Sequence, residues 1–121
     1  MTVAAFHLDQ DILSDGKYRL NKTIAYYSPR YKRTITVPAG RISDGATCAM
    51  DITSRGWWIH DELCLRGKWD DGTPLCNREC SQVLQDVLKA EGRYWQSKWW
   101  FWATLAFGGG KARENGIFSV A

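Results

Sequence analysis

Three residues could form a general acid–base or metal site: Asp44, His60 and Asp61. A histidine serves as a general base or a metal ligand, and a nearby carboxylate fixes its tautomer. Asp44 lies in the glycine-bearing loop Ser43-Asp44-Gly45, whereas His60 and Asp61 lie on an expected short helix. We expect Asp44 and His60 to lie within hydrogen-bond or single-water reach, which suits hydrolysis with or without a divalent metal. The alternative is a structural network in which the carboxylates accept backbone hydrogen bonds.

The cysteines offer a second type of chemistry. His60 and Cys64 are four residues apart, as are Cys76 and Cys80, so on helices each pair would face one way, as a two-helix zinc site requires. Cys76 and Cys80 also belong to the apolar stripe of their helix, and buried cysteines usually behave as small hydrophobic residues. We therefore expect Cys76 and Cys80 to be buried, reduced and unligated. The less favoured alternatives are zinc binding through Cys64, Cys76 and Cys80, and a disulfide.

An aromatic segment near the C-terminus predicts a partner surface. The chain has seven tryptophans in 121 residues. Trp95, Trp99 and Trp102 recur at helical spacing and are expected to face the core. Trp100 and Phe101 then point elsewhere, and we expect them to bind a protein partner or a second copy of the chain. The alternative is a helix that the fold covers on all sides.

Charge is distributed in blocks along the chain. The net charge of +3 is too weak to indicate nucleic acid by itself. Residues 17–41 contain seven Lys and Arg and no acid, whereas residues 42–91 contain nine acids and five bases. Tyrosines interleave the basic block, so stacking on bases is one alternative. We expect a solvated strand face instead and consider nucleic acid an unlikely partner, because no nucleic-acid-binding motif accompanies the block.

The elements that must position these residues form a single domain, 1–121. Residues 17–43 alternate like strands, residues 57–107 have helical spacing, and the tail 111–121 carries little signal. Thr73 and Pro74 predict the start of the second helix, and Gly92 predicts its end. Because strands and helices come in separate runs, we predict an α+β fold with an N-terminal antiparallel sheet of two to four strands packed by about three C-terminal helices.

Targeting signals are not evident in the sequence. No run of about 18 apolar residues occurs, so we expect no transmembrane segment. The N-terminus, MTVAAFHLDQD, lacks the positive and apolar regions of a secretory signal. We therefore expect synthesis in a cytoplasm, where cysteines start reduced.

A resemblance extends over roughly residues 18–110. The segment 37–47, VPAGRISDGAT, is followed by His60-Asp61-Glu62-Leu63 and then by Asn77-Arg78-Glu79. This order resembles a small phage and prophage family, domain of unknown function 1353, which has a Val-Pro-x-Gly-Phe-x-Thr-Asp-x-Ala-Ser segment followed by His-Asp-x-Leu-Tyr and Arg-x-Ala-Asp motifs. Asp44 and His60-Asp61 match the pattern, whereas Arg41, Cys64 and Cys80-Ser81 depart from it. The resemblance implies phage origin and a fold, and it implies no particular reaction.

These observations predict a small phage-encoded accessory protein that is hydrolase-like, with a cell-envelope component as the expected substrate. His60 would be the general base or ligand, and Asp44 and Asp61 would be orienting groups or ligands. The alternative is a non-catalytic protein, either tail-associated in the virion or directed at a host or defence protein, that binds its partner through the aromatic helix. We expect it in the host cytoplasm on synthesis, with association with the virion as a further expectation.

Overall fold

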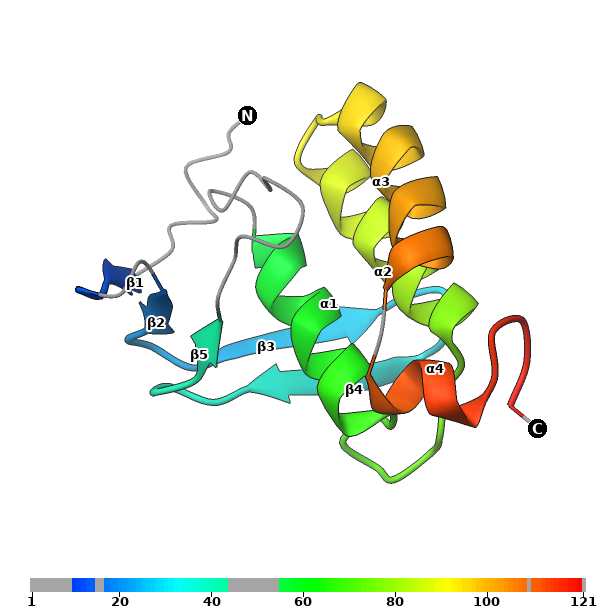
Figure 1. Cartoon of the computed structure of the whole chain (residues 1–121), viewed down its shortest axis with the longest axis horizontal. Coiled ribbons are helices and arrows are strands. Elements are labelled where there is room, and N and C mark those ends of the chain that lie inside the picture. The colour runs from blue at the N-terminus through cyan, green and yellow to red at the C-terminus, as the bar shows by residue number, and fades with distance from the viewer. Residues whose placement is uncertain (1–9, 15–16, 44–54, 109, 121) are drawn as a thin grey trace.

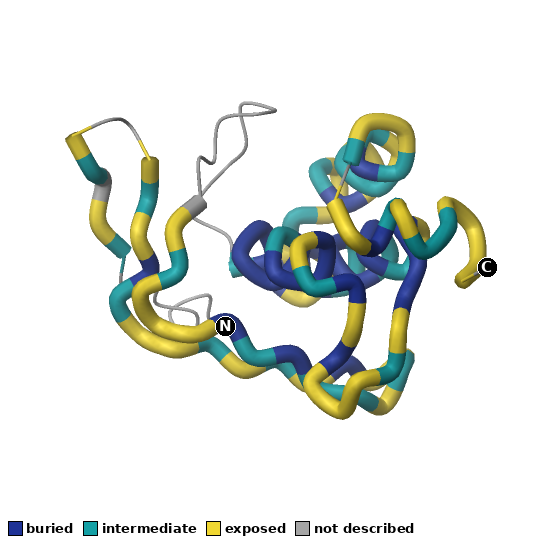
Figure 2. The backbone as a smooth tube through the Cα atoms, turned by 60° about the horizontal axis from the view of Figure 1, so that its bottom comes forward, coloured by how far each residue is buried: buried dark blue, intermediate teal, exposed yellow. Residues whose placement is uncertain are grey.

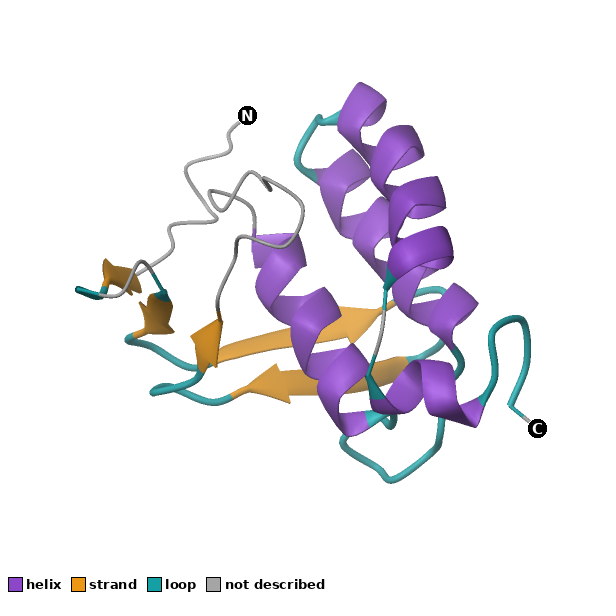
Figure 3. Cartoon of the chain, viewed as in Figure 1, coloured by secondary structure: helices purple, strands orange, loops and turns teal. Residues whose placement is uncertain are grey.

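The computed structural model describes residues 10–14, 17–43, 55–108 and 110–120. The elements are, in chain order, β1 (Gln10–Ile12), β2 (Tyr18–Leu20), β3 (Ile24–Ser28), β4 (Arg33–Val37), β5 (Ile42–Ser43), α1 (Arg55–Arg66), α2 (Asn77–Ala90), α3 (Tyr94–Phe107) and α4 (Lys111–Asn115). Strands occupy the N-terminal part and helices the C-terminal part (Figure 1, Figure 3). The α+β class is confirmed, with two small antiparallel sheets instead of one.

The longer strands, β3 and β4, form an antiparallel hairpin in which Ile24 pairs with Val37. Its turn contains Lys32 in the left-handed conformation, with φ of 56°. Ile35 and Val37 on β4 are fully buried, whereas the residue between them is half-buried, as the two-residue period of a strand predicts. The other sheet has the strand order β1-β2-β5. The buried face of the hairpin lies against α1 (Figure 1).

Helix α1 lies between the hairpin and α2 and anchors both sheets. Its Trp58 indole donates a 2.7 Å hydrogen bond to the side chain of Gln10 on β1. Glu62 is 1% exposed, and its carboxylate accepts two hydrogen bonds from Arg41, at 2.7 and 2.9 Å. Arg66 lies 3.6 Å from the same carboxylate. Because Arg41 and Arg66 neutralise the buried carboxylate of Glu62, this carboxylate can hold the segment before β5 against α1.

Helix α2 begins three residues later than the predicted Thr73–Pro74 start. Cys76 is its N-cap, and the Cys76 backbone N–H donates a 3.0 Å hydrogen bond to the side chain of Glu79, as in a capping box. At the other end Gly92 has a φ of +81° and follows the C-cap, as predicted. The N–H groups of Gly92 and Arg93 return to carbonyls of the last turn, which is a Schellman ending.

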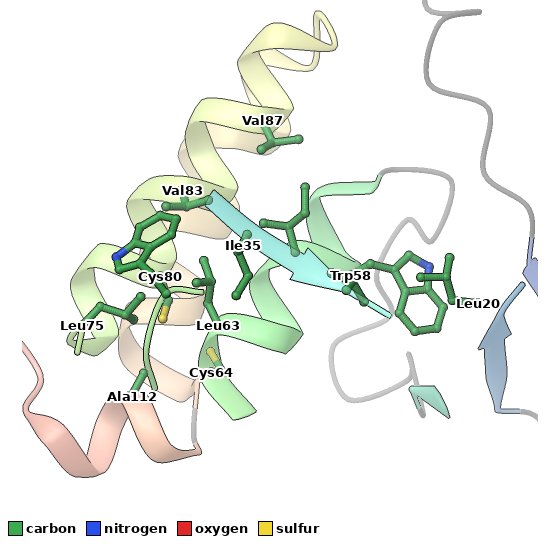
Figure 4. Packing of buried hydrophobic residues seen from close by; sticks show 13 residues of the cluster. Leu20, Ile35, Trp58, Leu63, Cys64, Leu75, Cys80, Val83, Val87 and Ala112 are labelled. Atoms are coloured by element: carbon green, nitrogen blue, oxygen red, sulfur yellow. The ribbon is translucent and has the colours of Figure 1, made fainter. Parts of the chain in front are cut away.

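Most of the apolar core lies between the hairpin, α1, α2 and α4, with Trp69 and Leu75 contributed by the segment before α2. Figure 2 shows that the buried residues are concentrated in the helical part. Figure 4 shows how side chains of this core pack. A smaller cluster lies between α1, α2 and α3 and consists of Trp57, Leu84 and Leu88 with Trp100 packed on it. The large cluster stabilises the hairpin and α1, and the small one attaches α3.

Arginines of the basic block form ion pairs with carboxylates. Arg30 binds both carboxylate oxygens of Asp86 on α2, at 2.8 and 3.1 Å. Three others form similar pairs, namely Arg19 with Asp11, Arg33 with Asp71 and Arg41 with Glu62. Arg19–Asp11 joins β1 to β2, whereas the other three pairs join the basic block to the acidic block and so connect the strand-rich part to the helical part.

Candidate functional site

His60, Asp61 and Cys64 lie close together on α1. His60 Nε2 is 3.5 Å from Cys64 Sγ, and His60 Nδ1 is 3.8 Å from Asp61 Oδ1. One helical turn separates His60 from Cys64, so the two side chains share a face. His60 is 5% exposed and Cys64 is 8% exposed, whereas Asp61 is half-buried. The structure thus brings His60 and Asp61 together and adds Cys64, which the sequence assigned to the core or to zinc.

The imidazole and the thiol perturb each other. Burial disfavours the imidazolium, but the negative charge of Cys64 and the interaction with Asp61 outweigh it and raise the pKa of His60 to about 10. Interaction with the Cys80 thiol and the charge of His60 outweigh burial and lower the pKa of Cys64 to about 5. The two opposite shifts favour charge separation between the thiol and the imidazole, and the thiolate is the nucleophilic form of a cysteine.

Asp44, the third predicted site residue, lies outside the described residues, and its approach to His60 stays a prediction. Within the described ranges, no three His, Cys, Asp or Glu side chains are arranged to hold a metal ion. Cys76 and Cys80 are buried, as predicted. Both are free thiols, and so is Cys64. In this part of the chain the cluster therefore offers thiol chemistry rather than a metal-ligand set.

The predicted assignment of faces on α3 is wrong. Trp95, Trp99 and Trp102, which were expected to face the core, are 88%, 67% and 66% exposed. Trp100 and Phe101, which were expected to bind a partner, are half-buried. A surface of exposed tryptophans therefore lies along one side of this helix of 14 residues. As a separate finding, the described helices include none that is long and apolar enough to cross a membrane.

Small polar residues explain why α3 is turned this way. Ser97 and Thr104 are its buried residues, seven positions apart, and they face α2. The Thr104 hydroxyl lies 2.7 Å from the hydroxyl of Ser81 on α2. Trp100 packs edge-on against Trp57, with ring centroids 4.9 Å apart. Small residues allow close approach of the two helices, whereas three tryptophans at this contact would hold them apart.

We call Trp95, Trp99, Trp102 and Ala106 the aromatic face of α3. With Trp side chains of about 250 Å², its three tryptophans expose about 550 Å². That is near the upper end for the largest apolar patch of a monomeric protein. Lys98 is the one charged residue of α3. With Trp95 and Tyr94 it lines a surface hollow of about 160 Å³ at the N-terminal end of the helix.

Comparison of the chain with protein-family models, curated proteins and solved structures gave no match. The geometry of the chain's own residues therefore carries the functional argument. Two features stand out in the described part: the buried thiol–imidazole cluster on α1 and the aromatic face of α3. Sequence reasoning predicted a partner surface on this helix but assigned it to Trp100 and Phe101, on the wrong side.

Proposed function

We propose that this chain is a non-catalytic binding protein that works as a self-associated unit, with the aromatic face of α3 as its docking surface. The observation that carries the proposal is the exposure of Trp95, Trp99 and Trp102 on one side of a helix whose other side is packed on α2. Exposing this much tryptophan to water is costly, because each buried Å² of apolar surface stabilises by about 25 cal/mol. A second copy of α3 covers the surface.

The spacing of the aromatic face favours a helix as its occupant. Its four residues follow one another at intervals of four, three and four, which is the spacing of the a and d positions where two helices pack side by side. A second α3 presents the same spacing, so the contact can be isologous about a twofold axis. Because tryptophans are bulky, we expect the two helices to lie at or beyond the upper end of the usual 8–10 Å separation, with the rings interleaved along the seam.

The area and charge of the aromatic face fit a dimer. Two such faces, wholly covered, bury about 1,100 Å² from tryptophan alone, which is close to the lower limit of specific protein interfaces before neighbouring residues are added. Lys98 is the single charge on the helix, and α3 contains no acid. An antiparallel pair keeps the two Lys98 side chains apart. A lipid-binding helix, by contrast, usually has a strongly charged polar face, and α3 has none.

We also propose, on the resemblance to a phage and prophage family alone, that such a dimer acts in a virion or at a host protein. In either setting the dimer is the unit that presents the remaining surface to its partner. We likewise propose that the chain is of phage origin, that it is synthesised in the host cytoplasm and that it contacts either a tail or a host protein. The experiment below measures self-association.

A hydrolase-like function acting on the cell envelope is the second proposal. It is favoured by the 3.8 Å contact between His60 and Asp61, and it also requires Asp44. The burial of His60 counts against it, because a general base must reach its substrate. Replacement His60→Ala should abolish hydrolysis of envelope material without unfolding the chain. Full hydrolytic activity in this variant, or no activity in the wild type, would remove the proposal.

Sedimentation equilibrium of the full chain tests self-association. We expect the wild type to dimerise reversibly, and we expect Trp99→Gln with Trp102→Gln to raise the dimer dissociation constant several hundredfold, since interface tryptophans contribute about 2 kcal/mol or more each. Glutamine keeps a high helix propensity. Tyr27→Gln is the matched control, because Tyr27 is 57% exposed on β3, outside the proposed surface.

Three outcomes contradict the proposal. The first is a wild type that stays monomeric at every concentration. The second is a dimer that the tryptophan replacements leave unchanged. The third is a monomer that floats with phosphatidylglycerol vesicles through the same tryptophans, which replaces a second copy with a lipid surface as the occupant.

A further inference from the structure

A pair of buried thiols from two helices meets beside a histidine. Cys64 comes from α1 and Cys80 from α2, and both belong to the large apolar cluster (Figure 4). Figure 4 draws the two sulfur atoms near each other in this cluster, and each thiol shifts the pKa of the other. On its own helix Cys64 lies 3.5 Å from Nε2 of His60. One thiol is therefore next to a base, and the other is next to the first thiol.

The groups around Cys64 favour its thiolate. From α1 the titratable neighbours are His60 and, behind it, Asp61; from α2 the neighbour is Cys80. Gly110, before α4, contributes backbone alone, and a Cβ at this position would lie 2.7 Å from the Cys64 carbonyl oxygen. The imidazolium and the Cys80 thiol lower the pKa of Cys64, whereas Asp61 and burial oppose them. The environment of Cys64 thus differs from that of an inert core thiol.

Cys80 and Cys76 lack this activation. Burial and the negative charge of Cys64 raise the pKa of Cys80 well above its ordinary value. Cys76 is 1% exposed at the N-cap of α2, and burial raises its pKa too. Cys80 is therefore the proton-bearing neighbour of the reactive thiol. Cys76 is a buried thiol of the same helix that lacks a histidine and serves as an internal reference.

We infer that Cys64 and Cys80 form a peroxide-sensitive pair, in which Cys64 is the oxidised thiol and Cys80 the resolving thiol. The Cys64 thiolate attacks one oxygen of hydrogen peroxide, the O–O bond breaks, and Cys64 becomes a sulfenic acid while hydroxide leaves and takes a proton from the imidazolium of His60 as water. The Cys80 sulfur then attacks the Cys64 sulfur, forming the disulfide and releasing a second water that carries the Cys80 proton. Peroxide is reduced by two electrons, and the two thiols lose them.

The product is a covalent link between α1 and α2. These helices form the centre of the fold, and α2 also carries α3. Oxidation therefore fixes the core contact between the hairpin side and the helical side of the molecule. The inference is independent of the proposed self-association, since neither thiol lies on the aromatic face.

Peptide mapping after mild peroxide treatment tests the pair. The experiment uses the full chain with the replacement Cys48→Ser, which removes the one cysteine outside the described residues. We expect a disulfide between Cys64 and Cys80, with Cys76 still reduced. In the variant Cys80→Ala, Cys64 should stop at the sulfenic acid and be trapped by a cyclic 1,3-dione. A Cys64–Cys76 or Cys76–Cys80 disulfide, or no disulfide in folded protein, would overturn the inference.

The pH dependence of alkylation by iodoacetamide tests the role of His60. In the wild type the rate at Cys64 should change little between about pH 6 and 8. In His60→Asn it should fall about tenfold per pH unit as the pH is lowered from 9, because the thiol then titrates near or above its ordinary pKa. The low pKa also makes the wild-type Cys64 thiolate intrinsically less nucleophilic than the thiolate of His60→Asn. The alkylation rates of the two proteins therefore converge near neutral pH, and they are compared at pH 6, where they differ.

The reference thiol distinguishes local reactivity from unfolding. If Cys64 reacts only in globally unfolded molecules, Cys64 and Cys76 are modified at the same rate, and the inference fails. Equal pH profiles for the wild type and His60→Asn would overturn it as well. Cys76→Ser, which retains a good N-cap residue, should leave both the disulfide and the Cys64 profile unchanged.

Discussion

Replacing Trp100 and replacing Trp99 should have opposite consequences, although the two residues are adjacent. Trp100 packs edge-on against Trp57 in the small cluster that attaches α3 to α2, whereas Trp99 is 67% exposed. A buried tryptophan replaced by alanine costs about 3–5 kcal/mol. Because Trp100 is half-buried, we expect Trp100→Ala to lower the free energy of unfolding by about 3 kcal/mol. Trp99→Ala should change it by less than about 0.5 kcal/mol.

Urea unfolding followed by far-ultraviolet circular dichroism measures both effects. The samples are kept dilute, because association would add to the stability of the wild type. With a urea dependence of about 1–3 kcal/mol per molar, the Trp100 replacement lowers the midpoint by 1 M or more. A double-mutant cycle with Trp57→Ala should give a coupling free energy of about 1 kcal/mol for the edge-on pair. A larger loss at Trp99 than at Trp100 would refute the orientation of α3.

Three further predictions concern the core. Glu62→Gln should lower the free energy of unfolding by about 2 kcal/mol in urea titrations, because its two partly exposed arginine partners lose their counter-charge; an unchanged midpoint would contradict this. Gly110→Ala should cost at least about 2 kcal/mol, against about 1 for Gly92→Ala: both glycines have positive φ, but an added Cβ meets the Cys64 carbonyl at 110 and nothing at 92. The raised pKa of His60 stabilises the fold fully below about pH 6.5, and this stabilisation is lost as the pH rises toward 10. The lowered pKa of Cys64 stabilises the fold fully above about pH 9, and this stabilisation is lost as the pH falls toward 5. The difference in unfolding free energy between the wild type and Cys64→Ser should therefore be flat between about pH 6.5 and 9 and fall on both sides; a difference that varies in one direction only would contradict the ion pair.

Local patterns predicted the parts of the fold that local chemistry determines. Alternation in residues 17–43 indicated strands, and the apolar stripe from Cys76 to Leu88 indicated α2, because each has one buried side. Gly92 ended α2 as predicted, since a left-handed residue is needed there. The start of α2 was misplaced because Thr73 and Pro74 resemble a helix start, whereas Glu79 caps the helix from Cys76.

The orientation of α3 could not be read from periodicity. Its aromatic and aliphatic residues lie on nearly all sides, so hydrophobicity alone does not select a buried face. The deciding features are the burial of Ser97 and Thr104 and the hydrogen bond between Thr104 and Ser81, and they depend on the partner helix. For the candidate site, the spacing of His60 and Cys64 was visible in the sequence, but the contact with Cys80 requires the packing of α2 on α1. Asp44 lies outside the described residues, so its place in the site stays a prediction.

Fluorine NMR of the chain with fluorotryptophan at all seven tryptophans tests self-association through α3. Spectra are recorded on the wild-type sequence over a dilution series, with single replacements used to assign the signals. We predict that the resonances of Trp95, Trp99 and Trp102 shift together with concentration, whereas those of the buried Trp58 and Trp69 stay fixed. Seven resonances that do not depend on concentration, or shifts confined to the buried tryptophans, would contradict this self-association.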